Sequence, residues 1–319
     1  MGNIYGFAGS GGGSKGAWGA GVAHYLINDL KRDYKYLSGT STGALQSLLI
    51  SINDTLRLRD GYTNVTNDDI YKSAPYNVIK NKNGVYKIKM NYFRIGWNML
   101  IRKQKTFGDS SKLRNKLLPN FFTEDDFKKL KELEKEIIVN VTNITKGLGE
   151  LKSSNDYHYN DFLDWVWAST CAVPFMSLAT KDNNEYADGG FTEHVPIQPL
   201  IDKGCTHIDV ITHRQPKLDI ELMRNPLNVI TRLIDIFLNE MSIKNLELGK
   251  LKAKNKNVVI NVYEPGRKLT NNELIFNKEE MRKWWNEGYE FARNKNCSTY
   301  LLKCNSKIEK INKPNIQDI

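Results

Sequence analysis

The chain has no long apolar segment. In its 319 residues, no hydrophobic run approaches the roughly eighteen residues that a membrane-spanning helix needs. The mean hydropathy is −0.51, and we therefore expect no transmembrane helix. A chain of this length can still bury a sizeable core, enough for one large domain or for one domain with an extension.

Cysteine is scarce and scattered. The sequence has no C-x-x-C spacing and no cysteine–histidine motif with the spacing of metal ligands, which excludes a disulfide framework and a cysteine-based metal site. We therefore expect reduced thiols, no metal, no cofactor and a cytoplasmic protein. We also expect no cleavable leader, because the first predicted strand already begins at residue 4. The four cysteines are Cys171, Cys205, Cys297 and Cys304.

Glycine, by contrast, is grouped where predicted strands end. Residues 39–43 read Gly-Thr-Ser-Thr-Gly, and they lie between a short apolar run and a helix-forming segment. A G-x-S-x-G pentapeptide in this context predicts a nucleophile elbow, a sharp turn in which the serine hydroxyl stands clear of the backbone. Gly39 and Gly43 leave room for that turn. Ser41 is therefore the candidate nucleophile.

A second glycine cluster lies near the N-terminus. Gly11, Gly12 and Gly13 follow an apolar run at residues 4–8 and precede a stretch with a helical pattern. A strand, a glycine loop and a helix in this order expose backbone N–H groups at a helix N-terminus, which attracts an anion. That anion is either a bound phosphate or the oxyanion of an acyl-transfer intermediate.

The third cluster is an acid followed by two glycines. Asp188, Gly189 and Gly190 end a short strand-like run. The glycines can adopt positive φ, which would let Asp188 point back toward the serine. An Asp-Gly pair by itself is common in turns, so this motif gains its meaning from the other two.

The three clusters, in this order, resemble the signatures of the patatin-like phospholipase family. Those signatures are a G-x-G-x-x-G loop with a basic residue near its end, a G-x-S-x-G elbow and a D-G-G turn. Residues 168–175, Ala-Ser-Thr-Cys-Ala-Val-Pro-Phe, are similar to another segment of the family, and Pro196 stands where the family usually has a proline. The likeness covers about residues 4–200.

The resemblance implies a lipid acyl hydrolase of the phospholipase A or lysophospholipase type. In such an enzyme Ser41 attacks the ester, Asp188 takes its proton directly, and an acyl-enzyme forms without a histidine. Lys15, at the family's basic position, orients the glycine loop or favours an anionic head group, and Gly16 completes the loop motif. The implied oxyanion donors are the N–H groups of Gly11, Gly12, Gly13 and Thr42.

Two other interpretations use the same residues. An ordinary Ser-His-Asp esterase needs a histidine after its acid, and only His194 and His213 have that position; we expect His194 to be a loop residue that lines the pocket. A dinucleotide-binding module is suggested by the glycine loop, but Asp33 lies ahead of the next strand rather than at its far end. The alternative from a different class is a phosphate-binding module or a membrane-surface scaffold without an acyl-enzyme.

The positive charge of the chain is concentrated in one segment. The formal net charge is +10, and residues 78–116 alone carry eleven basic residues against one acid, Asp109. Basic and aromatic residues interleaved in this way predict contact with an anionic phospholipid membrane surface, although a solvated cap with inward aromatics or a nucleic-acid patch would look similar. Without a nucleic-acid-binding motif, we expect a peripheral membrane contact and no nucleic acid, and no motif identifies an activating partner. The interleaved residues are Tyr86, Tyr92, Phe93, Trp97, Met99, Leu100 and Ile101.

Short apolar runs alternate with helical patterns along the chain. This alternation predicts an α/β fold, a three-layer α/β/α sandwich with a mostly parallel central sheet and ligands at the carboxyl ends of its strands. We expect a catalytic domain at residues 4–201, a basic cap insertion at about 55–130, and an α/β extension at 202–319 that completes the sheet. Within this extension, apolar residues at helical spacing over 226–252 should pack in the core, the interpretation we prefer to the alternative of contact with a partner helix. The predicted strands are 4–8, 34–38, 136–141, 185–187, 207–212 and 258–262.

Overall fold

The computed structural model describes residues 2–82, 84–213, 218, 220, 222–223, 226–270, 272–294, 297–301 and 309–311. Cys304 lies outside this part, whereas Cys171, Cys205 and Cys297 are free thiols. The strands are β1 (Tyr5–Gly9), β2 (Tyr34–Gly39), β3 (Tyr76–Lys80), β4 (Tyr86–Met90), β5 (Glu136–Asn143), β6 (Leu148–Ser153), β7 (Ala179–Lys181), β8 (Asn184–Asp188), β9 (His207–Ile211), β10 (Val259–Tyr263), β11 (Ser298–Leu301) and β12 (Glu309–Ile311).

Helices lie between most of these strands. Short helical turns at Gly13–Lys15 and Gly189–Phe191 begin within two of the glycine motifs, and a π-helical turn, Leu113–Leu117, precedes α6. The helices are α1 (Gly16–Asn28), α2 (Thr42–Ser51), α3 (Thr55–Asn64), α4 (Asn67–Ile70), α5 (Tyr92–Leu100), α6 (Leu118–Phe121), α7 (Glu124–Glu132), α8 (Tyr159–Ser169), α9 (Gln198–Asp202), α10 (Pro226–Lys256) and α11 (Lys278–Arg293). No described helix combines the length and the apolarity that crossing a bilayer requires.

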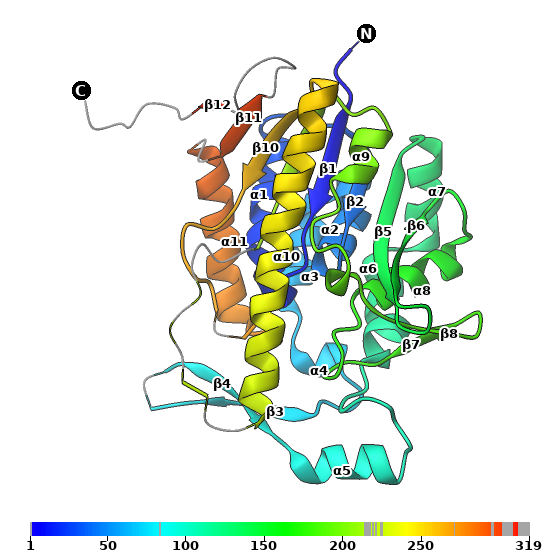
Figure 1. Cartoon of the computed structure of the whole chain (residues 1–319), viewed down its shortest axis with the longest axis vertical. Coiled ribbons are helices and arrows are strands. Elements are labelled where there is room, and N and C mark those ends of the chain that lie inside the picture. The colour runs from blue at the N-terminus through cyan, green and yellow to red at the C-terminus, as the bar shows by residue number, and fades with distance from the viewer. Residues whose placement is uncertain are drawn as a thin grey trace.

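One large sheet forms the centre of the described molecule (Figure 1). Its strand order is β12-β11-β10-β9-β1-β2-β5-β8-β7, with β6 paired to β5. The five strands from β10 to β5 run parallel, and antiparallel strands complete both edges. The parallel strands therefore all end at the same side of the sheet, and a site built there can draw on loops that are distant in sequence.

Each face of the sheet has its own core. Successive side chains of a strand point to opposite faces, so Phe7 belongs to a core with α1, α2 and α11, whereas Ala8 belongs to a core with α9 and α10. In Figure 1, α9 and α10 lie in front of the sheet and α1 lies behind it. This arrangement confirms the predicted three-layer α/β/α sandwich with a mostly parallel sheet.

The segment expected to form a cap at about 55–130 contains elements of two kinds. Its first helix, α3, packs against α1 and α11 in the layer behind the sheet. The β3–β4 hairpin and α5 instead stand at the end of the molecule toward which the parallel strands run (Figure 1). The part that projects from the sandwich therefore begins after α3.

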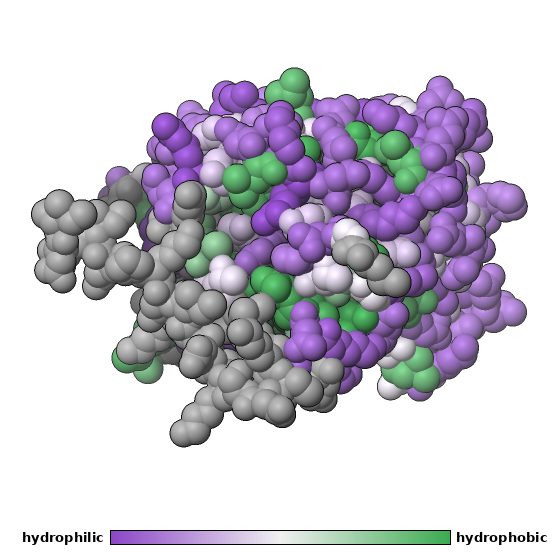
Figure 2. All heavy atoms as spheres, turned by 90° about the horizontal axis from the view of Figure 1, so that it is seen from above, coloured by the Kyte–Doolittle hydropathy of each residue, from purple (hydrophilic) through white to green (hydrophobic). Residues whose placement is uncertain are grey.

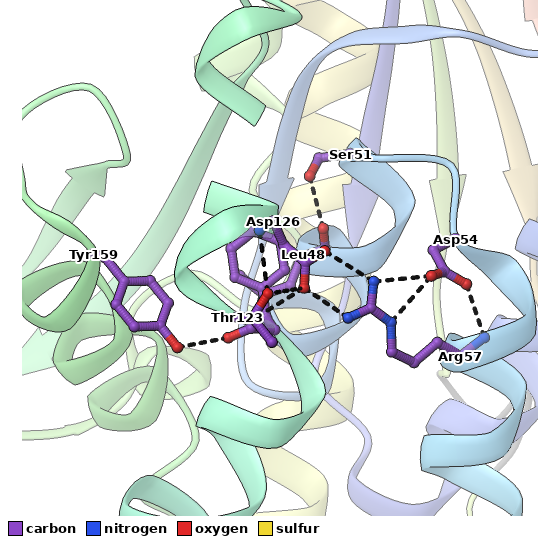
Figure 3. Close-up of polar contacts among 8 residues, drawn as sticks. Leu48, Ser51, Asp54, Arg57, Thr123, Asp126 and Tyr159 are labelled. Carbon is purple, nitrogen blue, oxygen red and sulfur yellow. Dashed lines mark hydrogen bonds and ion pairs between the residues drawn. The ribbon is translucent and has the colours of Figure 1, made fainter. Parts of the chain in front are cut away.

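A partly buried ion pair fixes the end of this segment to α3 (Figure 3). The guanidinium of Arg57 donates to both carboxylate oxygens of Asp126, at 2.6 and 2.9 Å, and also to Asp54. Asp126 in turn accepts from the N–H of Thr123 at 2.8 Å, which caps α7. Because α7 leads directly into β5, this network holds the return from the cap to the sheet in place.

The prediction that the apolar stripe of residues 226–252 packs in the core is wrong for most of that stripe, and above all for its first half. Ile230, Leu233 and Phe237 are 46, 60 and 42 % exposed. In the second half Leu248 is 49 % exposed, whereas its neighbour Leu246 is buried. The reason is geometric. The first half of α10 extends past the ends of the strands toward the β3–β4 hairpin (Figure 1), where no sheet lies beneath it.

Candidate active site

Ser41 occupies a strained turn between β2 and α2. Its φ and ψ angles are 54° and −120°, an uncommon combination for a residue with a side chain. Its backbone N–H donates to Ser169 Oγ at 2.9 Å, which fixes the turn from the side. This is the geometry of a strand-to-helix elbow at the carboxyl end of a parallel strand.

The elbow has room only for glycine at Gly43. A Cβ atom on Gly43 would lie 2.1 Å from the carbonyl oxygen of Gly9, and one on Gly39 would lie 2.4 Å from the carbonyl of Gly43. Helix α2 therefore touches the backbone of β1 directly. This close approach places Ser41 beside the loop that follows β1.

That loop presents a row of backbone N–H groups. The N–H groups of Gly11, Gly12 and Gly13 have no hydrogen-bond acceptor among the described residues. Gly13 has a φ of +52°, in the left-handed region, and a Cβ there would lie 2.3 Å from the carbonyl oxygen of Glu273. The N–H of Thr42, at the first position of α2, is likewise without an acceptor in the described part of the chain.

Two contacts hold the glycine loop in this shape. The N–H of Ser14 donates to the carbonyl of Glu273 at 2.8 Å, and Lys15 Nζ lies 2.9 Å from Glu273 Oε2. Gly16, the first residue of α1, faces Tyr62, whose ring would lie 2.5 Å from a Cβ at that position. Lys15, the basic residue of the predicted motif, is therefore paired with the carboxylate of Glu273.

Asp188 ends β8 and faces Ser41. It is buried, with an exposed fraction of 8 %, and its Oδ1 accepts from the N–H of Gly190 at 2.8 Å. Burial raises the pKa of the Asp188 carboxyl to about 7, opposed by hydrogen bonds from the Ser41 side chain and from Gly190. Gly189 lies against Asn140, where a Cβ would be 2.1 Å from the Asn140 carbonyl oxygen.

The segment 168–175 joins the elbow to the acid. Ser169 receives the Ser41 N–H, and two residues later the carbonyl of Cys171 receives the N–H of Asp188 at 2.8 Å. The sequence indicated this segment only through its resemblance to a family pattern. The structure gives it a physical purpose, which is to hold both sides of the site.

Two histidines also reach the site, and both are buried. His194 Nδ1 lies 2.7 Å from Ser242 Oγ, and burial lowers the pKa of His194 to about 4. His213 Nδ1 contacts Ser10 Oγ and the carbonyl of Gly11, and burial lowers the pKa of His213 to about 3. Neither imidazole has a carboxylate hydrogen-bond partner in the described structure.

These groups surround one cavity of about 990 Å³. Ser41, Asp188 and the glycine loop form part of its wall together with Lys15, His194 and His213. Most of the remaining wall is apolar, which favours a hydrocarbon ligand oriented by a few polar groups. Among the apolar lining residues are Leu45, Val65, Ile70, Leu117, Phe121, Phe175, Met176, Leu238 and Phe276.

Several residues of the site had no signal in the sequence. Glu273 lies between β10 and α11, in a stretch without a recognised motif, and Ser242 lies within α10. Within the described part of the chain, no three His, Cys, Asp or Glu side chains are grouped so as to hold a metal ion.

Comparison with known proteins agrees with the motifs. The family model of patatin-like phospholipases matches residues 8–201, more than half of the chain. No curated protein matches the sequence. Among solved structures, the crystal structure of VipD from Legionella pneumophila is similar to this chain. The alignment covers 93 % of this chain and 68 % of the VipD chain, at 15 % sequence identity and a TM-score of 0.47. From the family match, the chain belongs to the patatin-like phospholipases and is a hydrolase acting on ester bonds.

Proposed function

We propose that this chain is a phospholipase A or lysophospholipase that works through a Ser41–Asp188 dyad. One observation carries the proposal. The Ser41 hydroxyl lies close enough to the Asp188 carboxyl to lower the pKa of that carboxyl, and both residues line a large and mostly apolar cavity. A hydroxyl, a base and an apolar chamber are the parts that cleavage of an acyl ester requires.

In the first half of the reaction, Ser41 Oγ attacks the ester carbonyl carbon while Asp188 accepts the hydroxyl proton. The tetrahedral intermediate collapses with cleavage of the bond to the alcohol oxygen. The alcohol leaves with the proton from Asp188, and the acyl group remains on Ser41. In the second half, a water molecule gives a proton to Asp188 and attacks the acyl carbon. The bond from that carbon to Ser41 Oγ then breaks, Oγ takes the proton back from Asp188, and the fatty acid is released.

The developing oxyanion is stabilised by backbone N–H groups. Gly11, Gly12, Gly13 and Thr42 are the candidate donors, because their N–H groups have no acceptor among the described residues and all four residues line the cavity. Donors fixed before the reaction begins need no reorganisation as charge develops. The tight contacts of the loop with Glu273 supply this rigidity.

The raised pKa of Asp188 suits the role of base. An ordinary aspartate, with a pKa of about 3.9, takes a serine proton poorly. Burial brings the pKa of the Asp188 carboxyl to about 7. A general base works best when its pKa lies near the pH of the reaction. The carboxylate can therefore both accept the proton and return it.

His194 fits a catalytic triad poorly. A triad histidine needs a carboxylate on one ring nitrogen, to hold its orientation and to stabilise the imidazolium that forms. The Nδ1 atom of His194 instead contacts the hydroxyl of Ser242, and its pKa of about 4 disfavours protonation. We therefore assign His194 to the wall of the cavity.

The substrate surface that we propose is an anionic phospholipid membrane, with the protein peripheral to it. The excess positive charge in residues 78–116 supports this, because seven cations of that segment are exposed and have no carboxylate partner among the described residues. Those cations are Lys80, Lys82, Lys87, Lys89, Arg102, Lys103 and Lys116.

Mass spectrometry of a total lipid extract tests the proposed activity. Wild-type protein should generate free fatty acids and lysolipids, and Ser41→Ala and Asp188→Asn should each reduce their formation by at least about a thousandfold. A fluorophosphonate probe should label Ser41. Ser47→Ala is the matched control, since Ser47 lies on α2 and, among the described residues, its hydroxyl donates to the carbonyl of Gly43 alone. Undiminished ester cleavage by Ser41→Ala would refute the assignment.

A further inference from the structure

Helix α5 is amphipathic, but its apolar side faces solvent and its polar side faces the protein. In a water-soluble protein the apolar side of a surface helix normally faces the core. In α5 most of the apolar side chains face outward instead. Phe93 and Leu100 are 82 and 79 % exposed, and Asn98 is only 1 % exposed. The other outward residues are Tyr92, Trp97 and Met99, followed by Ile101 just past the helix end.

The polar side of α5 anchors it to the protein. Asn98 Nδ2 donates to Ser73 Oγ at 3.1 Å and to the carbonyl of Phe107 at 3.2 Å. Arg94 donates to the carbonyl of Ala74 at 2.8 Å, and Asn91 caps the helix through the N–H of Arg94. The outward direction of the apolar side is therefore set by hydrogen bonds to the body of the protein.

The exposed apolar surface is accompanied by positive charge. Lys87 and Lys89 of β4 are exposed, Lys87 at the edge of the cavity, and Arg102 and Lys103 follow α5 after Ile101. None of the four has a carboxylate partner among the described residues. Apolar side chains surrounded by cations complement a surface that is anionic at its head groups and apolar beneath them.

This surface is continuous with the active-site cavity. Tyr86, Ile88 and Met90 of β4 line the cavity, and α5 begins two residues after β4 ends. The exposed apolar side chains of α10, Ile230 and Leu233, belong to the half of that helix that extends toward the same hairpin (Figure 1). The opposite end of the molecule differs. Outside the grey atoms, it is predominantly hydrophilic with separate hydrophobic spots (Figure 2).

We infer that α5 is an interfacial membrane anchor, which inserts Phe93, Trp97 and Leu100 into an anionic phospholipid bilayer while the cations beside it bind the head groups. The choice of a bilayer as the partner rests on the proposed function, because an enzyme that cleaves phospholipids must bring its cavity to them. Insertion of α5 places the rim of the cavity at the level of the ester bonds.

Vesicle sedimentation with the Ser41→Ala protein tests this anchor without lipid breakdown. The two probes are vesicles of phosphatidylcholine alone and vesicles of phosphatidylcholine mixed with phosphatidylserine. The protein should bind the mixed vesicles at least about tenfold more tightly, and less so at high salt. Brominated acyl chains should quench the fluorescence of Trp97, and replacement by Trp97→Phe should remove that quenching.

Two double variants separate the contribution of apolar insertion to vesicle binding from the contribution of positive charge. Phe93→Ser with Leu100→Ser should weaken vesicle binding at least about tenfold, and Lys87→Gln with Lys89→Gln should weaken binding to the anionic vesicles about 25-fold. The matched controls are Leu56→Ser with Leu133→Ser and Lys31→Gln with Lys129→Gln, which alter exposed residues of the same types outside this end of the molecule. The controls should bind as the parent does.

The outcome for the anchor is independent of the outcome for catalysis. With Ser41 restored, the Phe93→Ser/Leu100→Ser protein should cleave a soluble short-chain ester at the wild-type rate and lose activity only on vesicles. Unchanged vesicle binding by this variant, or failure of the parent protein to bind anionic vesicles, would overturn the inference even if Ser41 proves essential for ester cleavage. Vesicle binding together with no esterase activity in the wild-type protein would uphold the anchor and refute the dyad.

Discussion

Lys15 Nζ lies 2.9 Å from Glu273 Oε2, and this ion pair joins the glycine loop after β1 to the segment between β10 and α11. The backbone reinforces it, since the N–H of Ser14 donates to the carbonyl of Glu273. The loop that we propose binds the oxyanion is therefore held by a residue more than two hundred positions away in sequence.

The first prediction concerns this pair. Glu273→Gln removes the charge opposite Lys15 and should lower kcat about tenfold, with a smaller effect on KM, because loosened N–H donors stabilise the transition state less well. Glu287→Gln, which removes the partner of Arg267 at the surface, is the control. Steady-state kinetics on a soluble ester provide the measurement, and wild-type kcat in Glu273→Gln would argue against a positioning role.

The second prediction separates a dyad from a triad. His194→Asn keeps a polar atom within reach of Ser242 and should retain activity within about tenfold of wild type. Asp188→Asn should lose at least about a thousandfold in kcat. Kinetics of the two variants on the same ester decide the matter, since equal losses would mean that the imidazole carries the proton.

The third prediction concerns pH. Because burial raises the pKa of Asp188 to about 7, kcat/KM should rise with pH and level off above a midpoint near this value. The same group should destabilise the fold at high pH. In the unfolded chain the pKa of Asp188 is about 3.9, so between about pH 4 and about pH 7 the folded state holds a proton that the unfolded state has lost, and stability falls as pH rises.

Asp188→Asn should abolish this contribution. At about pH 8 the variant should be more stable than wild type by up to about 4 kcal/mol. At about pH 4 the two proteins should have the same free energy of unfolding. Chemical denaturation at both pH values measures the difference. Asp202→Asn, at a carboxylate that is 57 % exposed, is the control. A gain of the same size at both pH values would exclude linkage to the carboxyl proton.

The fourth prediction concerns the elbow. Gly43→Ala places a methyl group 2.1 Å from the Gly9 carbonyl oxygen, which should cost about 3 kcal/mol or more of unfolding free energy, because two backbones must separate. Gly96→Ala, in α5, meets no atom within 4 Å and should stabilise by up to about 1 kcal/mol. Thermal unfolding compares them, and similar melting temperatures would contradict the close packing of α2 on β1.

Much of the fold was predictable from local patterns. Each short apolar run between helical segments is a strand of the sheet within a residue or two, because burial on both faces demands such runs. The positions of Ser41, Asp188 and the glycine loop followed from glycine, whose lack of a Cβ marks the turns at strand ends. The predictions failed for the first half of α10, whose apolar stripe has the helical period but no sheet to cover it.

The sequence by itself determined that three glycine motifs lie at the ends of strands. It also determined that one motif carries the Ser41 hydroxyl and another the Asp188 carboxyl. Both conclusions were possible because turn chemistry and periodicity are local properties. Only the tertiary structure decided that Ser41 meets Asp188, that Glu273 holds the loop through Lys15, and that α5 turns its apolar side to solvent. Periodicity identifies an apolar face but not its direction, and distant partners are chosen by the packing of the whole sheet.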